Sequence, residues 1–162
     1  AAVFADARQG GAEELRAAAA PAARFAHSVA DLVAHVAGGF RHGGLDRLHA
    51  VGLSEGFADP AVARAYLPDT LEPTLEAAGA RLQAHIARGE MRDVPARAAA
   101  LALLSPIVLI FLHQQALNGR RSHPTDIDAL LKAHIEGFVR GYATGTEPEE
   151  AGKSDTARRQ AP

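Results

Sequence analysis

Residues 101–142 read LALLSPIVLIFLHQQALNGRRSHPTDIDALLKAHIEGFVRGY, and this stretch decides the fold. Its first part is apolar on every face of a helix, carries Pro106 in its middle and ends at Asn118-Gly119. Its second part follows Pro124 and has one apolar stripe with the spacing of an amphipathic helix. A helix that is apolar all round must be covered all round, and a chain of 162 residues has little protein of its own to do so. The stretch therefore predicts two helices that pack against a partner chain.

Glycine and proline divide the rest of the chain into further helices, and no alternating run of β-branched and aromatic residues predicts a strand. Helices are expected within residues 1–20, from 21 or 22 to the glycines at 38–39 or 43–44, over 45–57, from 60 to a break or kink at 68, on to 88, from 93 to 117, and from 124. Asp59 and Asp93 are the predicted N-caps of two of them. The sequence predicts an all-α fold, an antiparallel bundle of about five to six helices over residues 1–145. The polar tail, residues 146–162, is expected to be disordered.

Composition narrows the function classes. The net charge of −2 gives no basic excess, so this stretch is not expected to bind nucleic acid itself. The absence of cysteine excludes a disulfide framework and thiolate chemistry. The longest apolar run, residues 98–112, is shorter than the roughly 20 residues that span a bilayer, and Ser105 and Pro106 interrupt it. We expect a cytoplasmic protein with no membrane segment.

The sequence contains no convincing motif for catalysis or metal binding. Residues 52–56 match G-x-S-x-G, but an amphipathic helix precedes them where a hydrolase has a strand, so we interpret them as a helix end. None of the 8 histidines stands three or four residues from another, so no local metal chelate is predicted. Asp126 and Asp128 fit the positive end of the last helix. We expect no catalytic residue, no metal, no cofactor and no enzymatic activity.

A family resemblance rests on the order of these elements. The stretch HAVGLSEGFADPAVARAYLPDTLEPTLEAAGARLQAHIARGEMR has a helix ending near Glu55, a proline-started helix, and a long helix ending in an RGEMR turn. LALLSPIVLIFLHQQALNG carries a Ser-Pro pair, and PTDIDALLKAHIEGFVRGYA closes on F-x-x-G at Phe138 and Gly141. From Ala50 to Tyr142 this succession resembles the C-terminal half of TetR/AcrR-type transcriptional regulators. The family's helix-turn-helix is missing, and only AAVFADA matches the helix that leads out of it.

The resemblance implies a regulatory domain of a transcriptional regulator, expected to be a repressor. Such a domain homodimerises through its last two helices and binds a small hydrophobic or amphipathic effector inside the bundle. DNA would be bound only through a helix-turn-helix that is not in this chain. The alternative is a free-standing helical adaptor without a small ligand, and a more distant one is a helical enzyme that handles metal or haem. A cavity of about 300–1,000 Å³ would distinguish a regulator from a solidly packed adaptor.

These considerations predict two sets of residues. The four-helix dimer interface is expected to use Ile110, Leu117, Ile127, Leu131, Ile135 and Phe138. The ligand pocket is expected between the helices near residues 25–36, 48–55, 71–82 and 105–111, lined by Leu48, Val51, Glu55, Tyr66, Leu75, Ala78, Leu104, Ser105, Phe111 and His113. The alternatives stay open that the stripe of the last helix covers only the chain's own core, and that the pocket residues are ordinary core or helix-end residues.

Overall fold

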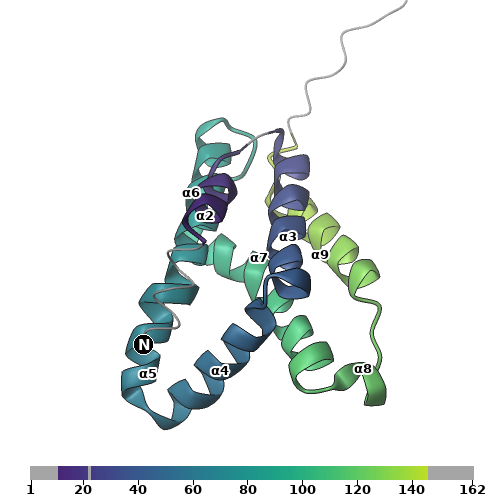
Figure 1. The fold of residues 1–162 in the computed structure, drawn as a ribbon. Helices are drawn as coiled ribbons and strands as arrows, with labels where there is room; N and C mark the ends of the chain where they lie inside the picture. Colours follow the sequence, from purple (N-terminus) through teal and green to yellow (C-terminus); the bar gives the residue numbers. More distant parts are fainter. Residues whose placement is uncertain (1–10, 22, 146–162) are drawn as a thin grey trace, which may run out of the picture.

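The computed structural model describes residues 11–21 and 23–145, and these fold into an all-α bundle without strands, as predicted (Figure 1). Its elements are α2 (Ala12–Ala19), α3 (Phe25–His42), α4 (Leu45–Ala58), α5 (Pro60–Tyr66), the π-helical turn η1 (Leu67–Leu71), α6 (Glu72–Ala87), α7 (Ala96–Phe111), the π-helical turn η2 (Leu112–Ala116), α8 (Gly119–Ser122) and α9 (Ile127–Tyr142). The predicted tail, residues 146–162, and the first half of the first predicted segment, residues 1–10, lie outside the described residues.

The bundle is organised around α3 and α7. Helix α3 packs against α4, α7 and α9, while α6 packs against α2 and α7 (Figure 1). In Figure 1, α5 and α6 form one side of the molecule, α3 and α9 form the other, and α7 crosses between them. The core side chains come from all of these helices and include Val29, Leu32, Phe40, Leu82, Leu103, Ile107 and Phe111.

Local signals place several helix ends. The Asp59 carboxylate accepts from Ala61 N at 2.8 Å, so Asp59 caps α5 as predicted. Asp126 accepts from Ala129 N at 3.0 Å, so the last helix begins at Ile127 and not at Pro124. Helix α3 ends at His42, the later of the two predicted ends, with Gly43 as its C-cap.

Of the break or kink predicted at Pro68, the structure shows no break, because the π-helical turn η1 joins α5 to α6 and accommodates a residue that donates no backbone hydrogen bond. The predicted start of α7 was wrong. Asp93 does not cap α7, which begins at Ala96 after Pro95 and has no side-chain cap. The fixed φ of proline sets the entry into this helix instead.

Arg81 fastens α2 to the bundle. Its side chain is 3% exposed and donates to the carbonyl oxygens of Ala18 at 2.6 Å and Ala17 at 2.8 Å. It also donates to Ser28 O at 2.9 Å and to the Asp31 carboxylate at 3.1 Å. Because Ala17 and Ala18 lie at the negative C-terminal end of α2, the guanidinium has a favourable place there, and it adds a second donor to Ala17 O, which also accepts from Ala20 N at 3.3 Å. One buried cation therefore joins α2, α3 and α6.

The apolar stripe of α9 covers the chain's own core. Leu131 and Phe138 are each 6% exposed, and the Phe138 ring lies 6.4 Å from the Phe25 ring of α3. His134 Nε2 donates to Leu103 O of α7 at 2.8 Å, and Arg41 pairs with Asp128. Leu131 and Phe138 were predicted at a dimer interface, but the structure buries both within one chain. An amphipathic period does not reveal which neighbour will cover it.

The other predicted interface residues differ in how far they are exposed. Ile127 and Ile135 of α9 and Ile110 of α7 are partly buried and pack against the core. Leu117, just after η2, is 73% exposed. The surface that remains for a partner is therefore different from the predicted stripe.

Candidate functional site

A large cavity lies where the ligand pocket was expected. It has a volume of about 1140 Å³ and is walled by α3, α4, α6 and α7, with parts of α2, α5 and η1. Most of its wall is hydrophobic and includes Leu32, Phe40, Leu48, Leu75, Leu104 and Val108. A hollow of this size and polarity accommodates a drug-sized molecule.

Glycines at the end of α3 shape one side of the cavity. A Cβ at Gly39 would lie 2.6 Å from Leu45 Cδ1, so glycine is needed there for α4 to pack closely after the turn. Gly44 has a φ of 73°, in the left-handed region, and N-caps α4. A Cβ at Gly38 meets no described atom within 4 Å, so this position faces open space on the cavity wall.

Polar side chains gather on the wall formed by α4, α5 and η1. His49 Nδ1 lies 2.5 Å from the Tyr66 hydroxyl, and the His49 ring stacks on Phe40 with centroids 5.1 Å apart. Thr70 lies four residues after Tyr66 and is 8% exposed, and its hydroxyl has no hydrogen-bond partner among the described residues. These three residues, His49, Tyr66 and Thr70, are called the polar cluster below.

Burial keeps the polar cluster uncharged. It lowers the pKa of His49 to about 4 and raises the pKa of Tyr66 to about 12. At neutral pH both rings are therefore neutral. Within the described part of the wall there is no lysine or arginine, and Asp69 is the one carboxylate. His35 and His42 lie on the wall as well and are exposed.

The G-x-S-x-G match serves packing. A Cβ at Gly52 would lie 2.2 Å from Tyr66 Cδ2, so glycine lets the tyrosine ring lie directly against α4. A Cβ at Gly56 would lie 3.6 Å from Ala63 Cα, where α4 and α5 come together. Ser54 is exposed and donates to Val51 O at 3.3 Å within its own helix. The motif belongs to a helix–helix contact, as the preceding amphipathic helix indicated.

Half of the predicted ligand-binding residues lie on the cavity wall: Leu48, Tyr66, Leu75, Leu104 and Ser105. The hydroxyl of Ser105 already donates to Leu101 O at 2.7 Å. Ala78 does not line the cavity, because it is fully buried one turn beyond the wall residues Thr74 and Leu75 of α6.

The remaining four predicted residues lie off the wall. Val51 and Glu55 are exposed on α4. Phe111 is fully buried and stacks on Phe40 with centroids 4.9 Å apart. His113 lies in η2, where its Nδ1 is 2.7 Å from Gln114 Nε2.

Sequence reasoning missed His49, Thr70 and Phe40. A signal for His49 existed, because it stands three residues before Gly52 on one face of α4. Nothing local connects it to Tyr66, however, since that contact depends on how α5 folds back along α4. Thr70 follows Tyr66 at helical spacing, but its position depends on η1 continuing the helix through Pro68.

Two further properties concern other kinds of site. Among the residues that the structure describes, no group of three or more His, Cys, Asp or Glu side chains is arranged to hold a metal ion. Residues 96–116 form one helical stretch of 21 residues that is long and apolar enough to cross a membrane, and 33% of its most apolar window is buried in the bundle. The sequence predicted one helix over residues 93–117 around this apolar run, and the core helix of a soluble protein can have the same length and composition.

Comparisons of the chain with protein-family models, with curated proteins and with solved structures gave no match.

Proposed function

We propose that this chain is the ligand-binding and dimerisation domain of a TetR-like transcriptional regulator, acting as a repressor. In this proposal a small hydrophobic effector occupies the cavity, and the protein works as a homodimer in the cytoplasm. DNA is bound by a helix-turn-helix outside this chain, so the domain itself is not an enzyme and needs no cofactor. The observation that carries the proposal is the cavity.

The cavity favours a ligand-binding domain over a solid adaptor. The hollow is partly open to solvent, so it exposes apolar side chains such as Leu101 and Leu109 to water, which is unfavourable unless something covers them. About 1140 Å³ bounded mainly by leucine, valine and phenylalanine is far more than a packing defect. An adaptor that works only through its outer surface has no use for such a volume.

Helix α2 offers a route from the cavity to whatever precedes this domain in a regulator. Leu15 and Ala18 of α2 lie on the cavity wall, and Arg81 holds the C-terminal end of the same helix. A ligand that fills the cavity therefore contacts α2 directly. In the proposed mechanism this contact changes the position of α2 and so of the DNA-binding part.

An exposed leucine supports the dimer. Leu117, just after η2, is 73% exposed and lies off the cavity wall, although a large apolar side chain contributes roughly 1.5–3 kcal/mol when buried. On α9 the exposed face carries Ala129, Ala133 and Gly137, whose small side chains permit close approach of another helix. We propose that these faces of α7, η2 and α9 meet their copies in the partner.

A dye-binding experiment tests the cavity. The hydrocarbon dye diphenylhexatriene fluoresces in apolar surroundings, and the wild-type protein should bind one molecule per chain. Gly38→Phe should abolish binding without unfolding the domain, because a side chain at Gly38 enters open space on the wall. Gly79→Phe is the matched control: it also adds a phenylalanine at an unhindered helical glycine, and Gly79 lies off the wall.

The two outcomes separate the proposals. Loss of binding in Gly38→Phe with retention in Gly79→Phe supports a ligand-binding domain. Equal binding in both variants, or no binding by the wild type, would favour the adaptor.

A further inference from the structure

We propose that the cavity selects uncharged amphipathic molecules, whose single hydroxyl or carbonyl oxygen is bound by the polar cluster of His49, Tyr66 and Thr70. This inference rests on the proposed function, since it specifies the chemistry of the ligand that the cavity takes. It commits to a neutral ligand over anions such as fatty acids and over lipophilic cations.

The polar cluster gives the ligand one place to form hydrogen bonds. Thr70 is nine-tenths buried on the wall, and its hydroxyl has no partner among the described residues. The hydroxyl oxygen itself is covered in the empty protein, so the Thr70 side chain must turn toward the cavity before a ligand oxygen can accept from it. A buried hydroxyl without a partner is unfavourable, so that hydrogen bond would remove a cost already present in the empty protein. Tyr66 stands four residues before Thr70 along the chain, and its hydroxyl lies 2.5 Å from His49 Nδ1 on α4. These two side chains restrict the positions that the ligand oxygen can take.

The charges on the wall argue against an anionic head group. A carboxylate or phosphate that leaves water needs a cation or several donors to replace its hydration. The described wall carries no lysine or arginine, and burial keeps the His49 imidazole neutral at physiological pH. His35 and His42 are on the wall but exposed to solvent, where they compete with water for an anion.

The charges argue against a cationic head group as well. Asp69 is the one carboxylate on the described wall, and it already takes part in another interaction. A cation bound there would have to share that carboxylate. The described wall has no lysine or arginine, and its one carboxylate is already engaged, so this wall and the Thr70 hydroxyl together favour a ligand with an oxygen and no charge.

Competition with diphenylhexatriene tests this selection on the wild-type protein. The competitors are dodecanol, dodecanoate and dodecyltrimethylammonium, which share one chain length and differ in the charge of the head group. Each is used below the concentration at which it forms micelles. Dodecanol should displace the dye at a concentration at least about tenfold lower than either ion, which corresponds to about 1.4 kcal/mol.

Displacement by dodecanoate or by the ammonium at the same or lower concentration would overturn the inference. The bound dye would still support a ligand-binding cavity in that case. Failure of the dye itself to bind would instead remove the proposed function, so the two failures are distinguishable.

A matched pair of threonines tests the polar cluster. Thr70→Val removes the unpaired hydroxyl and should weaken dodecanol binding about tenfold, while the dissociation constant of the hydrocarbon dye stays within twofold. Thr74→Val is the control, because Thr74 is on the same wall but its hydroxyl already donates to Thr70 O at 3.2 Å. Thr70→Ser, which keeps a hydroxyl, should bind dodecanol like the wild type.

Equal weakening by Thr70→Val and Thr74→Val, or no weakening by Thr70→Val, would show that Thr70 does not bind the ligand oxygen.

Discussion

Replacing Gly52 by alanine tests the contact that holds the polar cluster together. The added Cβ would lie 2.2 Å from Tyr66 Cδ2, 2.5 Å from Cε2 and 2.7 Å from Cγ. The Tyr66 ring lies between Gly52 of α4 and the cavity, so an added Cβ pushes it toward the cavity and out of its packed position. We therefore expect the ring to shift and its hydrogen bond with His49 to weaken.

The expected magnitude combines three effects. Overpacking a buried site costs about 1–3 kcal/mol. Weakening the His49–Tyr66 hydrogen bond costs about 1 kcal/mol more. Replacing a glycine inside a helix by alanine returns about 1 kcal/mol. The net expectation is that Gly52→Ala lowers the free energy of unfolding by about 2 kcal/mol.

Gly56→Ala is the matched control in the same helix and the same sequence motif. Its Cβ would lie 3.6 Å from Ala63 Cα, an ordinary van der Waals distance, so helix propensity should dominate and stabilise the protein by up to about 1 kcal/mol. Thermal unfolding followed by circular dichroism should show Gly52→Ala melting about 10 °C below Gly56→Ala for a domain of this size. Equal melting temperatures, or a higher one for Gly52→Ala, would refute the packing of Tyr66 on Gly52.

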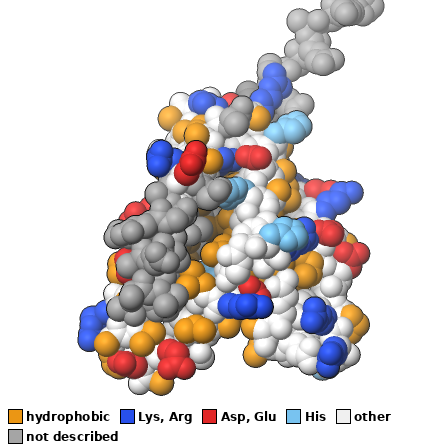
Figure 2. All heavy atoms as spheres, in the orientation of Figure 1, with side chains coloured by type: hydrophobic (Ala, Val, Ile, Leu, Met, Phe, Trp, Pro, Cys, Tyr) orange, Lys and Arg blue, Asp and Glu red, His pale blue; other side chains and the backbone are white. Residues whose placement is uncertain are grey.

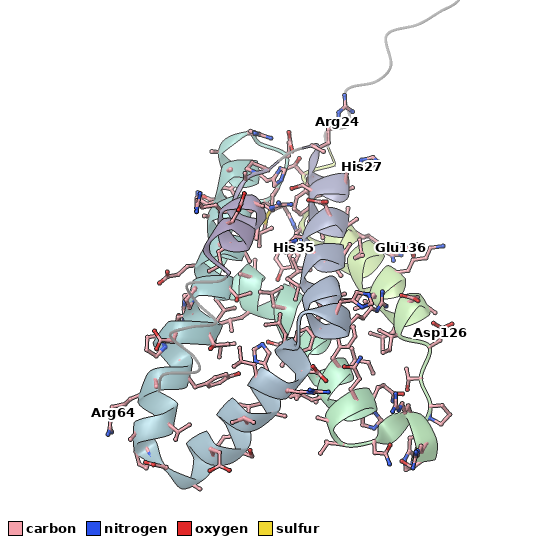
Figure 3. The ribbon with its side chains drawn as sticks, in the orientation of Figure 1. Arg24, His27, His35, Arg64, Asp126 and Glu136 are labelled. Atoms are coloured by element: carbon pink, nitrogen blue, oxygen red, sulfur yellow. The ribbon has the colours of Figure 1, made fainter. Side chains whose placement is uncertain are left out.

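Three further predictions concern other parts of the molecule. In denaturation experiments, Arg81→Leu should lower the free energy of unfolding by roughly 2–4 kcal/mol, and it should speed amide exchange in α2. Arg64→Leu is the control, because the Arg64 side chain is exposed and extends away from the bundle in Figure 3; it should change the free energy of unfolding by less than about 0.5 kcal/mol. Burial lowers the pKa of His49 from 6.5 to about 4, so as the pH falls the unfolded chain binds a proton at this residue before the folded chain does. The stability that this residue contributes is therefore complete above pH 6.5 and should be lost between pH 6.5 and 4, by up to about 3 kcal/mol. In urea titrations, His49→Phe should remove that part of the pH dependence. In sedimentation equilibrium, Leu117→Glu should give monomers. Phe57→Glu, at an exposed position near the C-terminal end of α4, should leave the dimer intact. A dimeric Leu117→Glu would place the interface elsewhere.

Phe57 is the control for Leu117 because it is also an exposed large hydrophobic residue, and it lies where α4 meets α5, away from the proposed dimer faces. Figure 2 shows hydrophobic side chains gathered there beside acidic ones, and Val51, Phe57 and Leu67 are the exposed large hydrophobic residues of these elements. The proposed dimer faces on α7, η2 and α9 include none of them.

Local signals in the sequence predicted the helices well. Asp59 with Pro60, Asn118 with its positive φ of 59°, and Gly89 with a φ of 71° mark helix boundaries through short-range chemistry, and the structure uses all of them. The cavity's place between the helices was also predictable, because apolar faces on consecutive helices had to meet around one interior.

The individual wall residues were harder to predict for a geometric reason. Each residue turns a helix by about 100°, and a π-helical turn shifts the register of the residues after it. The turn η1 continues the helix through Pro68, and this places Thr70 beside Tyr66 instead of in a loop. Ala78 shares a face of α6 with Thr74 and Leu75, but it lies one turn beyond the cavity, where it is fully buried.

The covering of α9 could not be predicted from its stripe. An apolar face at helical spacing is the same whether its own chain or a partner buries it. The His134–Leu103 hydrogen bond and the Arg41–Asp128 ion pair, both long-range contacts, settle that α3 and α7 cover this face. In Figure 3, Glu136 of α9 points outward, away from those helices.

Sedimentation velocity with diphenylhexatriene tests the central account most directly, because it measures assembly and ligand binding in the same sample. The account predicts one species containing two chains and two dye molecules. Gly38→Phe should sediment as the same dimer without dye, since the added ring occupies the cavity and leaves the dimer faces unchanged. A monomer, or a Gly38→Phe dimer that carries as much dye as the wild type, would contradict a dimeric domain that binds its ligand in this cavity.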